Sequence, residues 1–168
     1  MPAIQRDPLN MVGSSPGRLV WSDALLLGYG PMDASHRDFV DCVHAIQDAS
    51  DAALPAALAA FARHAETHFG EEDAWMRTTA FPAAQCHIDE HAAVLRSLSE
   101  VRTALEAGAH ASVARSLAKA LGDWFPGHAD YMDAALAHWM VRRRHGGTPV
   151  VLRRTPLPSS RPPHASER

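Results

Sequence analysis

Residues 55–77 read PAALAAFARHAETHFGEEDAWMR, and this stretch predicts both a helix and a chemical site. It is rich in Ala and Leu, which favour helix, and its leading proline suits a first helical turn. His68 and Glu72 are four residues apart, so on a helix they lie on one face and present two metal-ligand side chains to the same region. On spacing alone, His64 and His68 could instead be the ligand pair, and Glu71 competes with Glu72.

The rest of the central region has the same helical character. Glycines are few between residues 19 and 145, and breakers divide this region into runs of about 36–50, 55–77, 83–107 and 112–144. Asp33 or Ser35 can cap the first run, and no alternating pattern typical of strands competes. Four helices with short connections predict an all-α, antiparallel up-down-up-down four-helix bundle.

The 168 residues divide into three parts by composition. Residues 1–18 are expected to form a flexible arm, 19–145 the helical domain, and 146–168 a Pro-rich, disordered tail. The N-terminus lacks the apolar run of a signal peptide, and no stretch approaches the ~20 apolar residues of a membrane span. We therefore expect a cytoplasmic protein that does not associate with a membrane.

Charge and cysteine content exclude other classes. A formal net charge of −3 argues against nucleic-acid binding, which needs clustered Lys and Arg. The basic clusters 142–144 and 153–154 could bind an anion, but we interpret them as a solvated helix end and tail. Cys42 and Cys86 do not make a disulfide framework, and we expect both to be reduced and mostly buried.

Residue types that bind metals recur along all four expected helices. In chain order they are His36, His68, Glu72, His87, His91, His128 and Asp133. A single histidine on an apolar helix face is usually a core residue, whereas five imidazoles with two carboxylates suffice for two transition-metal ions inside a bundle.

The last pair has an unusual spacing. His128 and Asp133 are five residues apart, or about 140° around an α-helix, so they would share one ion less easily than an i, i+4 pair. Cys86 precedes His87, but adjacent helical residues point about 100° apart, which disfavours a thiolate ligand beside that imidazole. Pro126 lies inside the same expected helix and predicts a kink near His128.

The order and spacing of these residues resemble the hemerythrin family, and more closely its bacterial members. The matching stretches are Trp21 with Leu27-Gly28, Met32-Asp33-Ala34-Ser35-His36, His68-Phe69-Gly70-Glu71-Glu72, the His87/His91 pair, and Trp124-Phe125-Pro126-Gly127-His128 through Asp133. Within the resemblance, the HFxxEE pattern selects His68 and Glu72 over their neighbours. One departure is Ser35, where bacterial members more often have Gln.

The resemblance implies a non-haem di-iron centre. One iron would be held by His87, His91 and His128 and the other by His36 and His68, with Glu72, Asp133 and a solvent-derived oxo or hydroxo group bridging the two. The first iron would then have six ligands and the second five, which leaves one position open for dioxygen. Trp124 and Phe125 would wall that dioxygen pocket.

The function implied is reversible dioxygen binding by a carrier, store or sensor that is not an enzyme. Dioxygen is the expected ligand, and the sequence names no protein partner. Two alternatives remain: a di-iron enzyme that acts on peroxide or nitric oxide, and an iron-handling protein.

Overall fold

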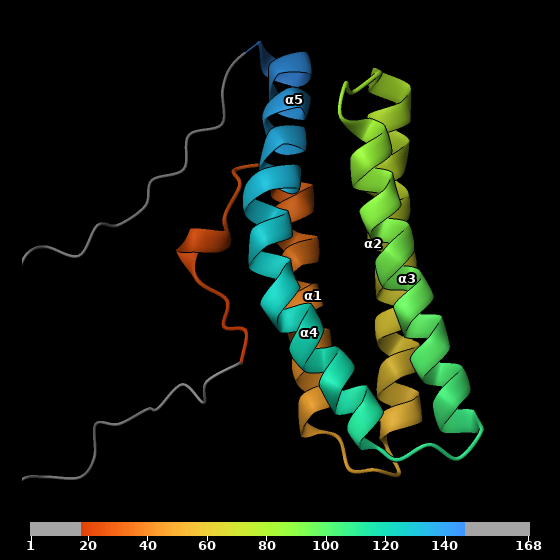
Figure 1. Cartoon of the computed structure of the whole chain (residues 1–168). Coiled ribbons are helices and arrows are strands. Elements are labelled where there is room, and N and C mark those ends of the chain that lie inside the picture. The colour runs from red at the N-terminus through yellow and green to blue at the C-terminus, as the bar shows by residue number, and fades with distance from the viewer. Residues whose placement is uncertain (1–17, 147–168) are drawn as a thin grey trace, which may run out of the picture.

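The computed structural model describes residues 18–146, and this region contains helices and no strand. The short helix η1 (Asp23–Leu25) precedes α1 (Gly30–Asp48), α2 (Leu54–Thr79), α3 (Ala84–Glu106) and α4 (Ser112–His128), and a π-helical turn η2 (Ala129–Asp133) joins α4 to α5 (Ala134–His145). Because α4, η2 and α5 follow one another as one continuous column, the described residues form four helical columns, each antiparallel to the one before it in the chain (Figure 1). The predicted all-α four-helix bundle is confirmed.

The first helix begins earlier than predicted, so neither Asp33 nor Ser35 is its N-cap. It starts at Gly30, and Asp33 lies one turn inside it. The Asp33 carboxylate instead accepts hydrogen bonds from the backbone N–H groups of Leu27, at 2.7 Å, and Gly28, at 3.1 Å. It therefore satisfies two backbone donors of the incoming loop and fixes how that loop enters the helix.

The last column departs from regular α-helix after Pro126. The α-helix continues through Pro126, and the π-helical turn begins three residues later, at Ala129. Such a turn bonds residue i to residue i+5 and inserts one extra residue into the helix. The irregularity thus falls between His128 and Asp133, on the C-terminal side of the predicted kink.

Two apolar clusters make the core, and the polar residues lie between them along each column. On α1, His36 lies between Met32 of one cluster and Phe39 of the other. On α2, Glu72 lies between Phe69 and Met76 in the same way, and Asp133 of the last column lies between Ala129 and Leu136. The bundle therefore encloses a polar layer with apolar side chains on both sides of it.

The two cysteines and the basic end of α5 lie in environments that differ from those predicted. Cys42 is half-buried but Cys86 is exposed, contrary to the prediction that both are mostly buried; neither forms a disulfide. Arg143 and Arg144 lie over the rings of Trp139 and Tyr29, so this helix end is partly packed.

The expected arm and Pro-rich tail, with its arginine pair, fall almost wholly outside the described residues. Between residues 18 and 146, no helix combines the length and apolar character needed to cross a membrane.

Candidate metal centre

All seven predicted ligand side chains are buried, with exposed fractions between 0 and 4%. They come from every column of the bundle: His36 from α1, His68 and Glu72 from α2, His87 and His91 from α3, His128 from the end of α4, and Asp133 from η2. Burying charged or ionisable groups in an apolar core is costly unless they are paired or bind a metal.

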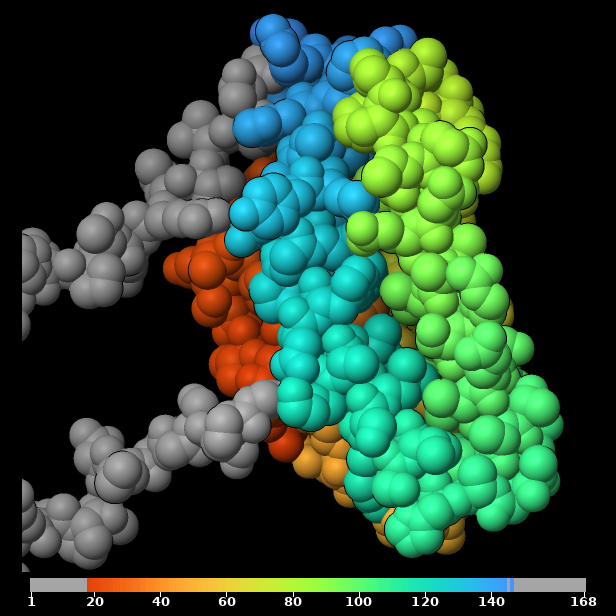
Figure 2. Space-filling view, viewed as in Figure 1, coloured from red at the N-terminus to blue at the C-terminus, as the bar shows by residue number. Residues whose placement is uncertain are grey.

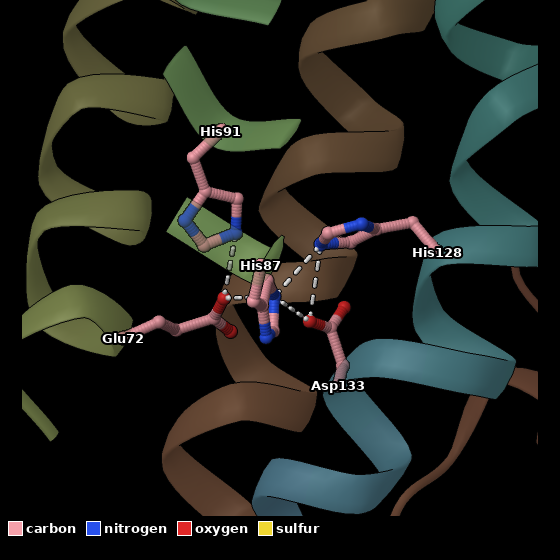
Figure 3. Close-up of side chains that lie close together, drawn as sticks. All are labelled: Glu72, His87, His91, His128 and Asp133. Carbon is pink, nitrogen blue, oxygen red and sulfur yellow. Dashed lines mark hydrogen bonds and ion pairs between the residues drawn. The ribbon is translucent and has the colours of Figure 1, made fainter. Parts of the chain in front are cut away.

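The larger group of ligand atoms lies where α2, α3 and the last column meet. One atom each from Glu72, His87, His91, His128 and Asp133 lies within 4.8 Å of the others (Figure 3). Nε2 of His87 is 3.0 Å from Oδ1 of Asp133 and 3.1 Å from Nε2 of His128. Two imidazole nitrogens this close both point to one place, where a cation or a shared proton would satisfy them.

The second group comprises His36, His68 and Glu72, again within 4.8 Å of one another. The two carboxylates connect the groups. Glu72 faces His68 with Oε1, at 3.7 Å from Nε2, and faces His91 with Oε2, at 3.3 Å. Asp133 faces His36 with Oδ2, at 3.1 Å, and turns Oδ1 toward the other group. Each carboxylate therefore divides its oxygens between two positions, as a bridging ligand would.

Helix geometry explains how the sequence spacings produce these groups. The pairs His68/Glu72 and His87/His91 are four residues apart on regular α-helix, so each pair shares a face. His128 and Asp133 are five apart, and the π-helical turn η2 between them brings Nε2 of the histidine to 3.2 Å from Oδ1 of the aspartate. The extra residue that a π-helical turn accommodates accounts for this spacing.

The cluster has the unsatisfied polar atoms that a metal would satisfy. The buried atoms without a hydrogen-bond partner include Nε2 of His36, His68 and His91 and both carboxylate oxygens of Glu72 and Asp133. Each such atom costs roughly 1–3 kcal/mol when it is left unpaired. Neutral imidazole and carboxylate ligands suit first-row transition metals such as iron. The residues present therefore fit a pair of such ions.

Electrostatics prepare the imidazoles of His68 and His91 for metal binding. Burial, and then repulsion from neighbouring histidines, lowers the pKa of His68 and of His91 to about 3, so both rings are neutral near pH 7. Burial and the adjacent Asp133 carboxylate raise the pKa of Glu72 well above its ordinary value. Burial alone would raise the pKa of Asp133, but the close imidazoles of His128, His36 and His87 hold it well below its ordinary value. A cation at the cluster would displace the proton from Glu72.

Two carboxylates that contact the Nδ1 atoms of ligand histidines were not predicted from the sequence. Nδ1 of His91 lies 2.9 Å from Oδ1 of Asp73, and Nδ1 of His128 lies 3.0 Å from Oε2 of Glu90. The same Glu90 oxygen accepts a hydrogen bond from Nε1 of Trp124 at 3.3 Å. Asp73 follows Glu72 and Glu90 precedes His91, so adjacency to a predicted ligand was the available signal.

The competing residues lie outside both ligand groups. The His64 ring stacks on His68, with ring centroids 5.8 Å apart, but His64 is only half-buried. Glu71 is exposed, and a ring nitrogen of the half-buried His44 pairs with the carbonyl oxygen of Leu19. The geometry thus favours His68 and Glu72 at the positions that the HFxxEE pattern selected.

The two aromatic residues predicted to wall one pocket lie against different histidines. The buried Phe125 ring meets His36 edge-on at 5.0 Å and stacks on Phe39 at 4.4 Å. The half-buried Trp124 ring stacks on His128 at 4.3 Å. Phe125 is therefore beside the group that contains His36 and His68, the two-histidine group. Trp124 covers the larger group, the three-histidine group, which contains His128.

A four-helix bundle that encloses five histidines and two carboxylates in this arrangement is a metal-binding bundle protein. Residues 27–139 match the family model described as the hemerythrin HHE cation-binding domain. The chain is also 42% identical over 123 residues to a protein named Bacteriohemerythrin from Ralstonia nicotianae, an overlap of 73% of this chain and 89% of that relative. The chain belongs to the hemerythrin family.

Proposed function

We propose that the protein binds dioxygen reversibly at a di-iron centre, as a carrier, store or sensor that requires no turnover. The observation that carries this proposal is the division of the Glu72 and Asp133 oxygens between a three-histidine and a two-histidine group. Family membership and the buried cluster support iron as the metal. When bound, the two irons supply the reversible dioxygen chemistry.

In this proposal His87, His91 and His128 would hold one iron and His36 and His68 would hold the other, with Glu72 and Asp133 each offering an oxygen to both positions. The two-histidine position has one protein ligand fewer, so it is the position that can accept an exogenous ligand. An apolar wall borders it, because the buried Phe125 lies against His36 and Phe39 stacks on Phe125. They position the histidine ring and keep water from the open side, which protects the reduced irons from oxidation.

The chain's own contribution is therefore to fix ligand geometry and to exclude water. His36, His68 and Phe125 have exposed fractions of 0, 3 and 1%, so the two-histidine position is sealed from bulk solvent. The i, i+4 and π-helical spacings hold the ligand atoms on helices, which lowers the cost of ordering them around a metal.

The test is an optical oxygenation cycle of the iron-loaded, reduced protein. The proposal expects a visible ligand-to-metal absorption band that appears in air and disappears under argon, over repeated cycles. A single irreversible conversion to an oxidised form would contradict reversible binding. Turnover of added peroxide or nitric oxide under the same conditions would favour the enzyme alternative. Slow release of iron, without reversible oxygenation and without turnover, would favour an iron-handling protein.

A further inference from the structure

The two metal positions differ in the hydrogen-bond partners of the Nδ1 atoms of their histidines. At the three-histidine position, two of the three imidazoles have a carboxylate on Nδ1: Asp73 on His91 and Glu90 on His128. At the two-histidine position, Nδ1 of His36 is buried without a hydrogen-bond partner, and among residues 18–146 no carboxylate is hydrogen-bonded to Nδ1 of His68. The rings beside that position are the apolar Phe125 and the stacked His64.

A carboxylate that accepts the Nδ1 proton makes the imidazole a stronger donor through Nε2. A stronger donor stabilises a metal ion more as its charge increases, so it favours the ferric over the ferrous state. Two such donors act on one ion of the pair, while the shared bridges Glu72 and Asp133 act on both. Apart from the third histidine, the difference between the positions therefore comes from Asp73 and Glu90.

We propose that Asp73 and Glu90 are positioning residues that make the two irons electronically unequal, so that the iron at the three-histidine position is the first to lose an electron. The inference rests on the proposed di-iron centre but not on its binding dioxygen.

Glu90 is the stronger of the two influences. Its Oε2 joins His128 and the indole of Trp124, which stacks on that histidine, so one oxygen fixes both the donor and the ring that covers it. Asp73 is in addition paired with Arg77, Nη2 to Oδ2 at 3.2 Å, which offsets part of its charge. The Glu90 side chain is 40% exposed at the seam between α3 and α4, the green and teal helices that meet on the face shown in Figure 2. Replacing it with glutamine, which has the same shape, therefore leaves the buried ligands in place.

The test compares Glu90→Gln, Glu90→Ala and Asp73→Asn in the iron-loaded full chain under argon. A glutamine keeps a hydrogen-bond acceptor on His128 and removes the charge, whereas alanine removes both. The matched control is Asp89→Asn, because Asp89 is the exposed neighbour of Glu90 on α3 and bonds Gln85 rather than a ligand. The measurements are the two one-electron reduction potentials, by spectroelectrochemistry, and the Mössbauer spectrum of the half-oxidised form.

We expect Glu90→Gln to destabilise the first ferric site about tenfold, at the lower end of the effect of such outer residues, which corresponds to about 59 mV for one electron. The second potential moves less, Asp73→Asn gives a smaller shift in the same direction, and Asp89→Asn gives none. Glu90→Ala adds a broadened ferric Mössbauer site as His128 loses its fixed orientation.

Unchanged potentials in Glu90→Gln, or equal shifts of both steps, would overturn the proposal even where stability falls. Because these measurements are made without dioxygen, a failure of this inference can be distinguished from a failure of the proposed function. A protein that never binds dioxygen still gives both reduction potentials.

Discussion

Replacing Phe125 with alanine tests whether the aromatic wall beside His36 protects the two-histidine position. The ring is 1% exposed, stacks on Phe39 and meets His36 edge-on. Truncation of a buried phenylalanine costs about 3–5 kcal/mol of unfolding free energy. Leucine fills much of the space but loses two aromatic contacts, each worth about 0.5–1.5 kcal/mol, so Phe125→Leu should cost about 1–3 kcal/mol.

The new space at position 125 should take up water, although purely apolar cavities stay dry. A cavity holds water when polar partners line it, and this one would border the His36 ring and, beyond it, the Asp133 carboxylate. We therefore expect faster autoxidation of the oxygenated protein in the order Phe125→Ala, Phe125→Leu, wild type. The assay follows the decay of the visible band at fixed temperature, and urea unfolding measures stability in parallel.

The matched control is Phe61→Ala. Phe61 is fully buried and packs on Phe39 at 5.1 Å, about two turns of α2 before His68, among apolar residues. It should lose a similar amount of stability with no change in autoxidation rate. An unchanged rate in Phe125→Ala, or equal acceleration in both variants, would refute the idea that Phe125 keeps water from the open position.

Three further predictions concern the ligands and the fold. His68→Ala should abolish reversible dioxygen binding while far-ultraviolet circular dichroism still reports most of the helix; normal oxygenation of this variant would show that His68 is not a ligand. Asp33→Ala should lower the free energy of unfolding by about 2–3 kcal/mol, because the N–H groups of Leu27 and Gly28 lose their acceptor, and a loss under about 0.5 kcal/mol in urea titrations would contradict that role. Removing metal with a chelator should lower the thermal midpoint, because the ions bind only the folded state, and calorimetry that finds equal midpoints with and without metal would argue against binding at this buried cluster.

The helices and most of the ligand geometry follow from local sequence. Ala- and Leu-rich runs between breakers predict the columns, and the i, i+4 spacing predicts that His68 and Glu72 share a face. The π-helical turn did not follow, because nothing in the local sequence distinguishes an i+5 turn from regular helix. The five-residue spacing of His128 and Asp133 was its only trace.

Contacts between helices were the other limit. Asp73 reaches His91 from α2 to α3, and Glu90 reaches His128 from α3 to α4, so both pairings depend on how neighbouring helices are aligned. A single sequence does not contain that alignment. The different neighbours of Trp124 and Phe125 could have been predicted, because adjacent residues on a helix point about 100° apart.

Anomalous diffraction at the iron absorption edge would show whether the buried cluster holds two irons in unequal histidine sets. The prediction is two separate iron peaks, one among His87, His91 and His128 and one beside His36 and His68, with Glu72 and Asp133 between them. A single peak, or iron bound away from these side chains, would contradict the assignment.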